Sequence, residues 1–178
     1  MSTTSAGPVA DPEVDGPHPS PPRAIGMRVM LPVALAVVVL DQLTKWWALE
    51  RLATENIDVF WTLRFNLVFN SGSAFSLGQG LGPVLGVLAV VVVVALVRVG
   101  RLVSNLPTAI ALGMVLGGAV GNLADRLFRS DGEGFLGGHV VDFIDFQWWP
   151  VFNVADIGIV VGGLLLVLVA MRVPADGT

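Results

Sequence analysis

The sequence predicts an all-α polytopic membrane protein, with four transmembrane helices and a small β-like platform and loop at the membrane surface. Just over half of the residues are apolar (54%) and only 13% are charged, whereas a soluble domain carries roughly 25% charged residues. The apolar residues are gathered into four long stretches, and polar residues cluster at the edges of those stretches. These observations indicate an integral membrane protein.

A helix needs about 20 apolar residues to cross a hydrocarbon core roughly 30 Å thick. The stretches of about this length are residues 27–48, 81–99, 106–123 and 154–173. They define a membrane domain over residues 27–173, between tails at 1–26 and 174–178. The N-terminal tail is rich in Pro, Ser, Thr, Gly and Asp, so we expect it to be disordered.

Each stretch has a feature that supports a helix in the membrane. The first ends at Trp46 and Trp47, where interfacial aromatic residues belong, and it is too long for a cleaved secretory signal. The second is dominated by valine, but its length favours a helix over a strand. The third carries Gly113, Gly117 and Gly121 at every fourth position, a spacing that lets helices approach closely in lipid.

The two longer loops, at about 50–80 and 124–153, lie on the same side of the membrane because two spans separate them, and one span separates each of them from the nearer terminus. The first contains IDVFWTLRFNLVF, whose alternation predicts short strands. Both loops are rich in aromatic residues, so we expect a platform that rests on the membrane surface.

Composition excludes several classes of chemistry. The chain has no cysteine, which excludes disulfides, thiolate metal sites and a cysteine nucleophile. One of its two histidines lies in the tail and the other in a loop, so neither a zinc site nor a Ser-His-Asp triad is supported. No phosphate-binding loop and no basic run for nucleic acid is present. We expect no metal and no cofactor.

Polar side chains at the span edges are the candidate functional residues, because ionisable groups in lipid need partners. Asp41 and Lys45 are spaced i, i+4 and can form a helical ion pair. Asn70 lies in FNSGSAFS, which also fits a simple turn. In GNLADRL, Asp125 and Arg126 could be a solvated helix end. Asn122, one turn further inside, needs a partner.

Two further carboxylates fall in the last loop and at the start of the fourth span. Asp142 lies in the apolar run VVDFIDF and Asp156 in FNVAD, with Pro150 between them. Taken singly, Asp142 could be a turn residue and Asp156 a carboxylate at a helix N-terminus. Taken together, they could share one proton, so that one takes a proton from water and the other hydrogen-bonds a scissile carbonyl.

Five strings occur in order along the chain: LDQLTKWW, FNSGSAFS, GGAVGNLADRL, VVDFIDF and FNVAD. Together they closely resemble the lipoprotein signal peptidases of bacteria (signal peptidase II), over about residues 30–170. The sequence departs from the family's pattern in the longer stretch RSDGEGFLGG and in Ser73, where alanine is expected.

The resemblance implies an aspartyl endopeptidase that removes signal peptides from diacylglyceryl-modified prolipoproteins, cutting on the N-terminal side of the lipidated cysteine. By position, Asp142 and Asp156 would be catalytic. The resemblance further assigns the substrate pocket to Asn70, Asn122 and Arg126, and support of the site to Asp41, Lys45 and Asn153. It assigns structural roles to Asp125 and Asp145.

The resemblance also places the protein in the bacterial cytoplasmic (inner) membrane, in contact with membrane lipids. Both termini would be cytoplasmic and the active site would lie on the extracytoplasmic face. Counting Lys and Arg residues gives no orientation by itself, because the two sides carry equal numbers. We expect a monomer.

Two other functions fit parts of the pattern. A small proton- or ion-coupled transporter could use the same carboxylates as a relay, but it predicts ionisable groups near mid-membrane and inverted repeats. A membrane scaffold could use the glycine-rich third span to bind partner helices, but it leaves the loop carboxylates and asparagines without a purpose.

Overall fold

The structure is a computed structural model that describes residues 25–72, 82–129 and 135–172. The predicted tail at 1–26 lies outside the described residues apart from its last two, and the tail at 174–178 lies wholly outside them. Ser73 and part of the stretch RSDGEGFLGG also fall outside.

Within the described residues, four helices are long and apolar enough to cross a membrane. They are α1 (Gly26–Arg51), α2 (Gly82–Gly100), α3 (Leu106–Phe128) and α4 (Val154–Arg172). The shortest have 19 residues and therefore rise roughly 28 Å, close to the thickness of a hydrocarbon core. The predicted fold class, four membrane helices with a small β platform, is confirmed.

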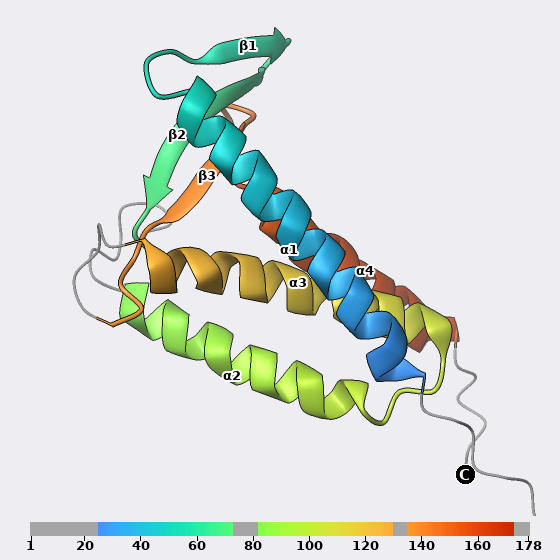
Figure 1. Ribbon diagram of the computed structural model, residues 1–178. Coiled ribbons are helices and arrows are strands. Elements are labelled where there is room, and N and C mark those ends of the chain that lie inside the picture. The colour runs from blue at the N-terminus through green and yellow to red at the C-terminus, as the bar shows by residue number, and fades with distance from the viewer. Residues whose placement is uncertain (1–24, 73–81, 130–134, 173–178) are drawn as a thin grey trace, which may run out of the picture.

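Helix α3 lies at the centre of the bundle and packs against α1, α2 and α4 (Figure 1). Its glycines permit this arrangement. A Cβ on Gly117 would lie 2.6 Å from the carbonyl oxygen of Ala34 in α1, and one on Gly118 would lie 2.2 Å from that of Ala155 in α4. The glycine-rich third span therefore has the packing role that its spacing predicted.

The platform is a three-stranded antiparallel sheet in the order β1-β2-β3, formed by β1 (Ile57–Phe60), β2 (Leu63–Asn70) and β3 (Val140–Asp145). The sequence predicted strands only in the first loop, so β3 is a new element, and Asp142 lies in a strand rather than in a turn. The register pairs Val68 with Asp142, which brings the end of β2 beside the carboxylate.

Aromatic residues attach the sheet to the end of α1. Trp47 packs edge-on against Phe65 of β2, with ring centroids 5.3 Å apart, and also against Phe143 of β3. Phe143 is buried together with Ala48 and Leu52. This apolar contact fixes the platform on the helical bundle.

Asp145, the last residue of β3, joins β3 to β2. Its carboxylate accepts hydrogen bonds from Arg64 Nε at 2.8 Å, from Asn66 Nδ2 at 3.2 Å and from the backbone N–H of Gln147 at 2.6 Å. Burial by itself would raise the pKa of Asp145, but these three hydrogen bonds outweigh it and hold the pKa below its ordinary value. The contacts give Asp145 a place in holding β2 to β3.

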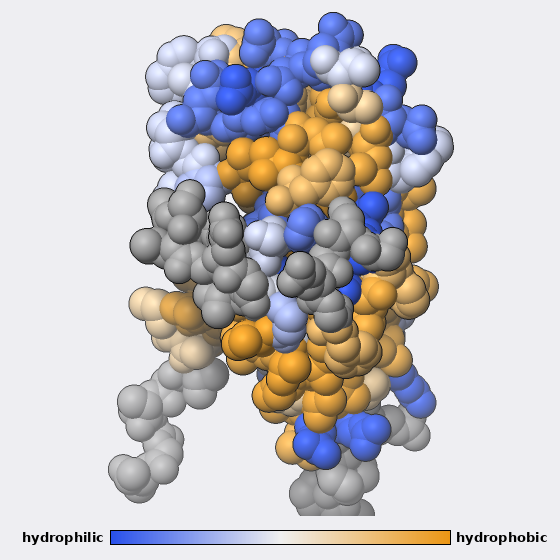
Figure 2. Space-filling model, turned by 90° about the vertical axis from the view of Figure 1, so that its left-hand side faces the viewer, coloured by the Kyte–Doolittle hydropathy of each residue, from blue (hydrophilic) through white to orange (hydrophobic). Residues whose placement is uncertain are grey.

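The molecular surface has an apolar belt between two polar ends, as Figure 2 shows. Large aromatic side chains are exposed on the platform and on the loop after β3, including Trp61 at 86% and Trp148 at 67%. Exposed Trp residues beside an apolar belt are typical of the membrane interface.

A matched pair of glycines tests the packing of α3. We expect Gly118→Ala to lower the thermal unfolding midpoint in detergent, because the added Cβ meets the Ala155 carbonyl oxygen and overpacking costs about 1–3 kcal/mol. Gly163→Ala in α4 is the control, since its Cβ would meet nothing within 4 Å. Equal midpoints for the two variants would contradict the packing role.

Candidate active site

The first turn of α4 holds Asp156 in a reciprocal cap. The backbone N–H of Asp156 donates to Asn153 Oδ1 at 3.0 Å, and the backbone N–H of Asn153 donates to Asp156 Oδ2 at 3.2 Å. This capping box satisfies two backbone donors that would otherwise be unpaired at the helix start. It leaves the second carboxylate oxygen of Asp156, Oδ1, for contacts with α3.

Asp142 is buried in β3, with 2% of its surface exposed. One of its carboxylate oxygens accepts from Asn70 Nδ2 at 3.0 Å and the other from Asn153 Nδ2 at 2.6 Å. The amide of Asn70 is itself oriented, because its Oδ1 accepts the backbone N–H of Gly72 at 2.9 Å. The turn predicted at FNSGSAFS therefore directs an amide donor at Asp142.

Asn122 connects the two carboxylates. Its Nδ2 donates to Asp156 Oδ1 at 2.8 Å, and its Oδ1 accepts from Asn153 Nδ2 at 3.0 Å. Since the same Asn153 amide binds Asp142, a continuous chain of hydrogen bonds runs from Asp142 through Asn153 and Asn122 to Asp156. The fold thus brings the two loop carboxylates into one polar site.

The surroundings favour a protonated Asp142. Burial raises the pKa of its carboxyl to about 7, hydrogen bonds from Asn70 and Asn153 oppose that rise, and the negative charge of Asp156 adds to it. A carboxyl whose pKa is close to neutrality can hold or release a proton near physiological pH.

A buried ionic cluster supports the site from α1 and α3. Lys45 Nζ lies 2.8 Å from Asp41 Oδ2 and 2.9 Å from Asp125 Oδ2, and all three side chains are almost completely buried. Asp125 also binds Arg129 Nε at 3.1 Å. The predicted i, i+4 pair is present, but it belongs to a larger cluster that includes a carboxylate from α3.

The cluster reaches both elements that carry the candidate catalytic residues. Asp41 Oδ1 accepts the backbone N–H of Ala155, next to Asp156, at 2.9 Å. Asp125 Oδ2 accepts the backbone N–H of Val141, next to Asp142, at 3.1 Å. The cluster therefore positions the start of α4 and the strand β3 together.

The alternative of a solvated helix end at GNLADRL is wrong. Asp125 is 2% exposed and Arg126 is 8% exposed, because β3 and the segment before it cover the end of α3. Arg126 donates to the carbonyl oxygen of Gly138 at 3.4 Å. It also lies close enough to Asp142 to interact with it electrostatically.

Two apolar hollows adjoin the polar site. A groove of about 290 Å³ lies between α2, α3 and α4, with Asn122 and Arg126 as its polar residues. Its apolar lining consists of Leu85, Leu88, Ala89, Val92, Val115, Ala119 and Ile159. Such a groove suits an apolar ligand with a polar end at the level of the carboxylates.

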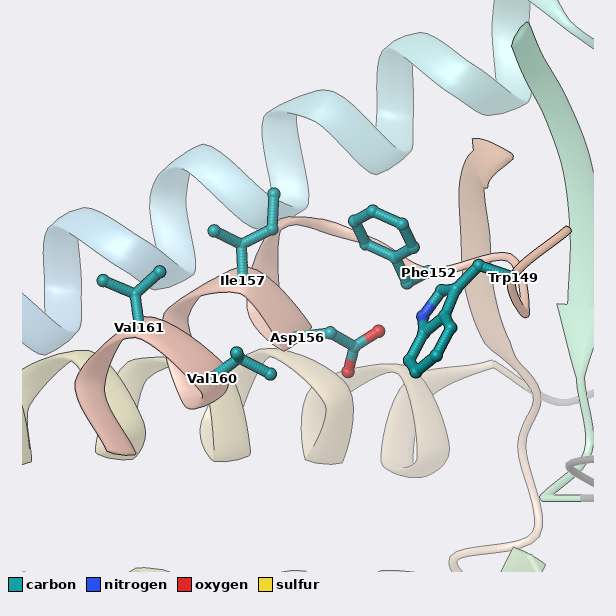
Figure 3. Close-up of a pocket in the computed structure, with 6 residues that line it drawn as sticks. All are labelled: Trp149, Phe152, Asp156, Ile157, Val160 and Val161. Carbon is teal, nitrogen blue, oxygen red and sulfur yellow. The ribbon is translucent and has the colours of Figure 1, made fainter. Parts of the chain in front are cut away.

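The second hollow, of about 260 Å³, contains Asp156 itself. Figure 3 shows its carboxylate turned toward the indole of Trp149, with Phe152 beside them and Val160 below on α4. Asp156 is half-buried, so it is the member of the pair that lies open to a ligand.

Sequence reasoning overlooked two contributors to the site. Gln42 donates to Asp41 Oδ2, to the Gly121 carbonyl oxygen and to Asp125 Oδ1, at 3.1–3.3 Å. Its place beside Asp41 in LDQLTKWW was the available signal. Trp149, one of the loop aromatic residues and not among the residues named for the site, lines the hollow around Asp156.

Comparisons with known proteins agree on one family. The family pattern described as Signal peptidase (SPase) II matches residues 33–172. The lipoprotein signal peptidase of Mycobacterium tuberculosis (strain ATCC 25618 / H37Rv) is 44% identical over 172 residues, which is 96% of this chain and 81% of the relative. That of Rhodococcus jostii (strain RHA1) is 43% identical over 177 residues, covering 94% and 86%.

Solved structures of bacterial membrane enzymes have a similar fold. A bacterial membrane enzyme solved by the in meso method at 2.3 Å resolution has a TM-score of 0.70 and 25% identity, over 85% of this chain and 93% of that one. A second, solved by the same method at 1.9 Å, has a TM-score of 0.68 and 26% identity, over 83% and 96%. With its four spans, its small sheet and a matching family pattern over most of its length, the chain belongs to the signal peptidase II family.

Proposed function

We propose that this chain is an aspartyl endopeptidase that removes signal peptides from diacylglyceryl-modified prolipoproteins with Asp142 and Asp156. Membership of the signal peptidase II family makes it a membrane protease that processes lipoproteins. The observation that carries the aspartyl mechanism is the hydrogen-bonded chain that links the two carboxylates through Asn153 and Asn122.

The chemistry follows from one proton shared by two carboxyl groups. The ionised group takes a proton from a bound water, whose oxygen attacks the scissile carbonyl. The protonated group donates a hydrogen bond to the carbonyl oxygen and stabilises the negative charge that develops there. The proton taken from water then passes to the leaving amine as the C–N bond breaks. No metal and no covalent intermediate is needed.

The lipid-modified end of the substrate fits the groove between α2, α3 and α4. Its apolar lining would hold the acyl chains, while Asn122 and Arg126 at the polar end would bind the ester carbonyls. Asn70 donates one amide hydrogen to Asp142, and we propose that its second hydrogen binds a substrate carbonyl. A lipid-anchored substrate reaches such a groove by diffusing within the bilayer.

Residues behind the dyad would hold it in place. Asn153 binds both the Asp142 carboxylate and Asn122, and Asp41 and Lys45 belong to the buried cluster that contacts the start of α4. We assign these three residues to support of the site. The described chain supplies both carboxylates and the groove, so we propose that it acts as a monomer.

We place the termini in the cytoplasm and the active site on the outer face of the cytoplasmic membrane. The start of α1 and the end of α4 lie at the end of the bundle opposite the sheet (Figure 1). Arg98, in the last turn of α2, and Arg101, between α2 and α3, are exposed at that end. On the sheet side, Lys45 and Arg129 are paired with carboxylates, so that the free positive charge favours cytoplasmic termini.

The transporter alternative is less well supported. Apart from the exposed Glu50, the described carboxylates of the spans, Asp41, Asp125 and Asp156, belong to one network at the sheet end of the bundle. A proton pathway needs ionisable groups at successive depths across the membrane. The peptidase reading uses the whole network, including its position at the edge of the bilayer.

Substitution of either carboxylate tests the catalytic pair. We expect Asp142→Asn and Asp156→Asn each to reduce the cleavage rate of a purified diacylated prolipoprotein by roughly 10²–10⁴-fold, the usual contribution of general acid–base catalysis. Asp58→Asn is the control, because Asp58 is an exposed residue of β1. A folded Asp142 or Asp156 variant that cleaves at the wild-type rate would refute the assignment.

The pH dependence of cleavage tests the shared proton. Because the pKa of Asp142 is raised to about 7, both carboxylates become ionised as the pH rises past that value, and the protonated member is lost. We therefore expect kcat/KM to fall on the alkaline side of about pH 7. A rate that keeps rising through this range with a stable protein would be incompatible with the proposed mechanism.

Filling the groove tests where the acyl chains bind. We expect Val92→Trp, which narrows the groove, to raise KM for the diacylated substrate at least about tenfold, equivalent to losing the burial of about two methylene groups. Val91→Trp is the matched control, because Val91 is 58% exposed and does not line the groove. The groove assignment fails if both variants show the same KM.

A further inference from the structure

We propose that Lys45 is a positioning residue that sets the orientation of the Asn122 amide, and so presents an N–H donor rather than a carbonyl oxygen to Asp156. This inference rests on the proposed peptidase function and adds a specific task to a residue that is buried behind the site. Lys45 itself has no exposed surface.

The contacts of Lys45 use its whole hydrogen-bonding capacity. Its ammonium has three protons, and Nζ lies within hydrogen-bond distance of three oxygens: Asp41 Oδ2 at 2.8 Å, Asp125 Oδ2 at 2.9 Å and Asn122 Oδ1 at 3.0 Å. An ammonium group can only donate. The atom of Asn122 that faces Lys45 must therefore be the oxygen, and the amide nitrogen must face the opposite way.

The opposite side of the Asn122 amide is occupied by Asp156. Asn122 Nδ2 donates to Asp156 Oδ1 at 2.8 Å. In a flipped amide, the NH₂ group would meet the ammonium and the oxygen would meet the carboxylate, which repel each other in both places. The charge of Lys45 thus selects the orientation that stabilises an ionised Asp156.

Asn153 supports the same orientation of the Asn122 amide, but with a neutral donor that it shares among several acceptors. Its NH₂ group has two hydrogens but lies near three acceptors: Asp142 Oδ1 at 2.6 Å, Asn122 Oδ1 at 3.0 Å and the Val141 carbonyl oxygen at 3.3 Å. The shortest of these contacts goes to Asp142. Among the described donors to Asn122 Oδ1, Lys45 is the charged one, so it makes the larger contribution to the orientation of this amide.

The same ammonium acts on the other carboxylate through Asp125. Asp125 Oδ2 accepts from both Lys45 and the Val141 N–H, which precedes Asp142 in β3. The charged groups that face this cluster are Asp41 from α1, Asp125, Arg126 and Arg129 from α3, Asp142 from β3 and, through Asn122, Asp156 from α4. One buried cation therefore organises both halves of the dyad.

A series at position 45 separates donor-only side chains from the others. Three substitutions are made at this position: Lys45→Arg, Lys45→Gln and Lys45→Met. Each is combined with Asp41→Asn, which removes the carboxylate that would otherwise lose its cation. The other carboxylate of the cluster, Asp125, retains Arg129 as its partner. Asp41→Asn with Lys45 intact is the reference. Arginine can only donate, glutamine can present either end of its amide, and methionine can do neither.

We expect the Arg variant to keep most of the reference kcat, and the Gln and Met variants to lose roughly 100-fold, the effect of a misplaced catalytic group. KM should change by less than about threefold, because Lys45 does not line the groove. The pH–rate profile of the Gln and Met variants should differ from that of the reference, since the amide donor beside the dyad is misplaced.

Arg64→Met controls for the loss of an ion pair away from the site. It breaks the Arg64–Asp145 pair of 2.8 Å on the platform, so it should lower the unfolding midpoint without moving the pH profile. If the Gln variant, which can still fill the space, keeps the kcat and pH profile of the reference, the inference is overturned. The same holds if kcat follows the unfolding midpoint across the whole series.

Failure of this inference is distinguishable from failure of the proposed function. A wild-type protein that never cleaves a diacylated prolipoprotein would overturn the peptidase proposal. A cleaving wild type with inactive Asp142→Asn and Asp156→Asn variants, but with no difference between Arg and Gln at position 45, would overturn only the role of Lys45.

Discussion

The ammonium of Lys45 has no exposed surface and lies among oxygens contributed by α1 and α3. A buried charge is tolerated only when it is fully paired, and removing one partner of such a pair costs about 3–5 kcal/mol. The surrounding oxygens are therefore constrained as strictly as the cation. Through Asp41 they hold the start of α4, and through Asp125 they hold β3. This cluster therefore helps to fix the positions of the two candidate catalytic aspartates.

The glycines of α3 make that cluster possible. A Cβ on Gly121 would lie 2.7 Å from the Asp41 carboxylate, and one on Gly118 would overlap the backbone of Ala155. Larger residues at these positions would move α1 and α4 away from α3 and separate the carboxylates from their donors. The same glycines of α3 are thus required both for close packing of the helices and for the geometry of the site.

The site lies where three environments meet. The sheet covers it on one side, the apolar groove lies between α2, α3 and α4, and the hollow beside Trp149 leaves Asp156 accessible. Burial on the sheet side accounts for the raised pKa of Asp142, whereas in the proposed function the open side would admit substrate and water. A protease for lipid-anchored substrates needs both properties, because its carboxylates must be desolvated enough to share a proton and must still be reachable from the bilayer.

Local sequence predicted much of this architecture. Hydropathy and length predict the four spans, the i, i+4 spacing predicts the Asp41–Lys45 pair, and Asp156 lies at the N-terminus of a helix, as its place before the fourth apolar stretch allowed. The residues named for the site came from a family resemblance rather than from spacing. Spacing alone also allowed Asp142 to be a turn residue and Asp156 to be a carboxylate at a helix N-terminus.

Tertiary structure decided the rest. The bond between Asn70 and Asp142 joins residues 72 positions apart and depends on the register of β2 and β3, which alternation in one strand cannot specify. The burial of Asp125 and Arg126 depends on β3 covering the end of α3, and the orientation of Asn122 depends on a lysine from another helix. Hydropathy and periodicity are properties of one segment, and so they determine the elements. The candidate site is a property of contacts between segments, and only the fold supplies those.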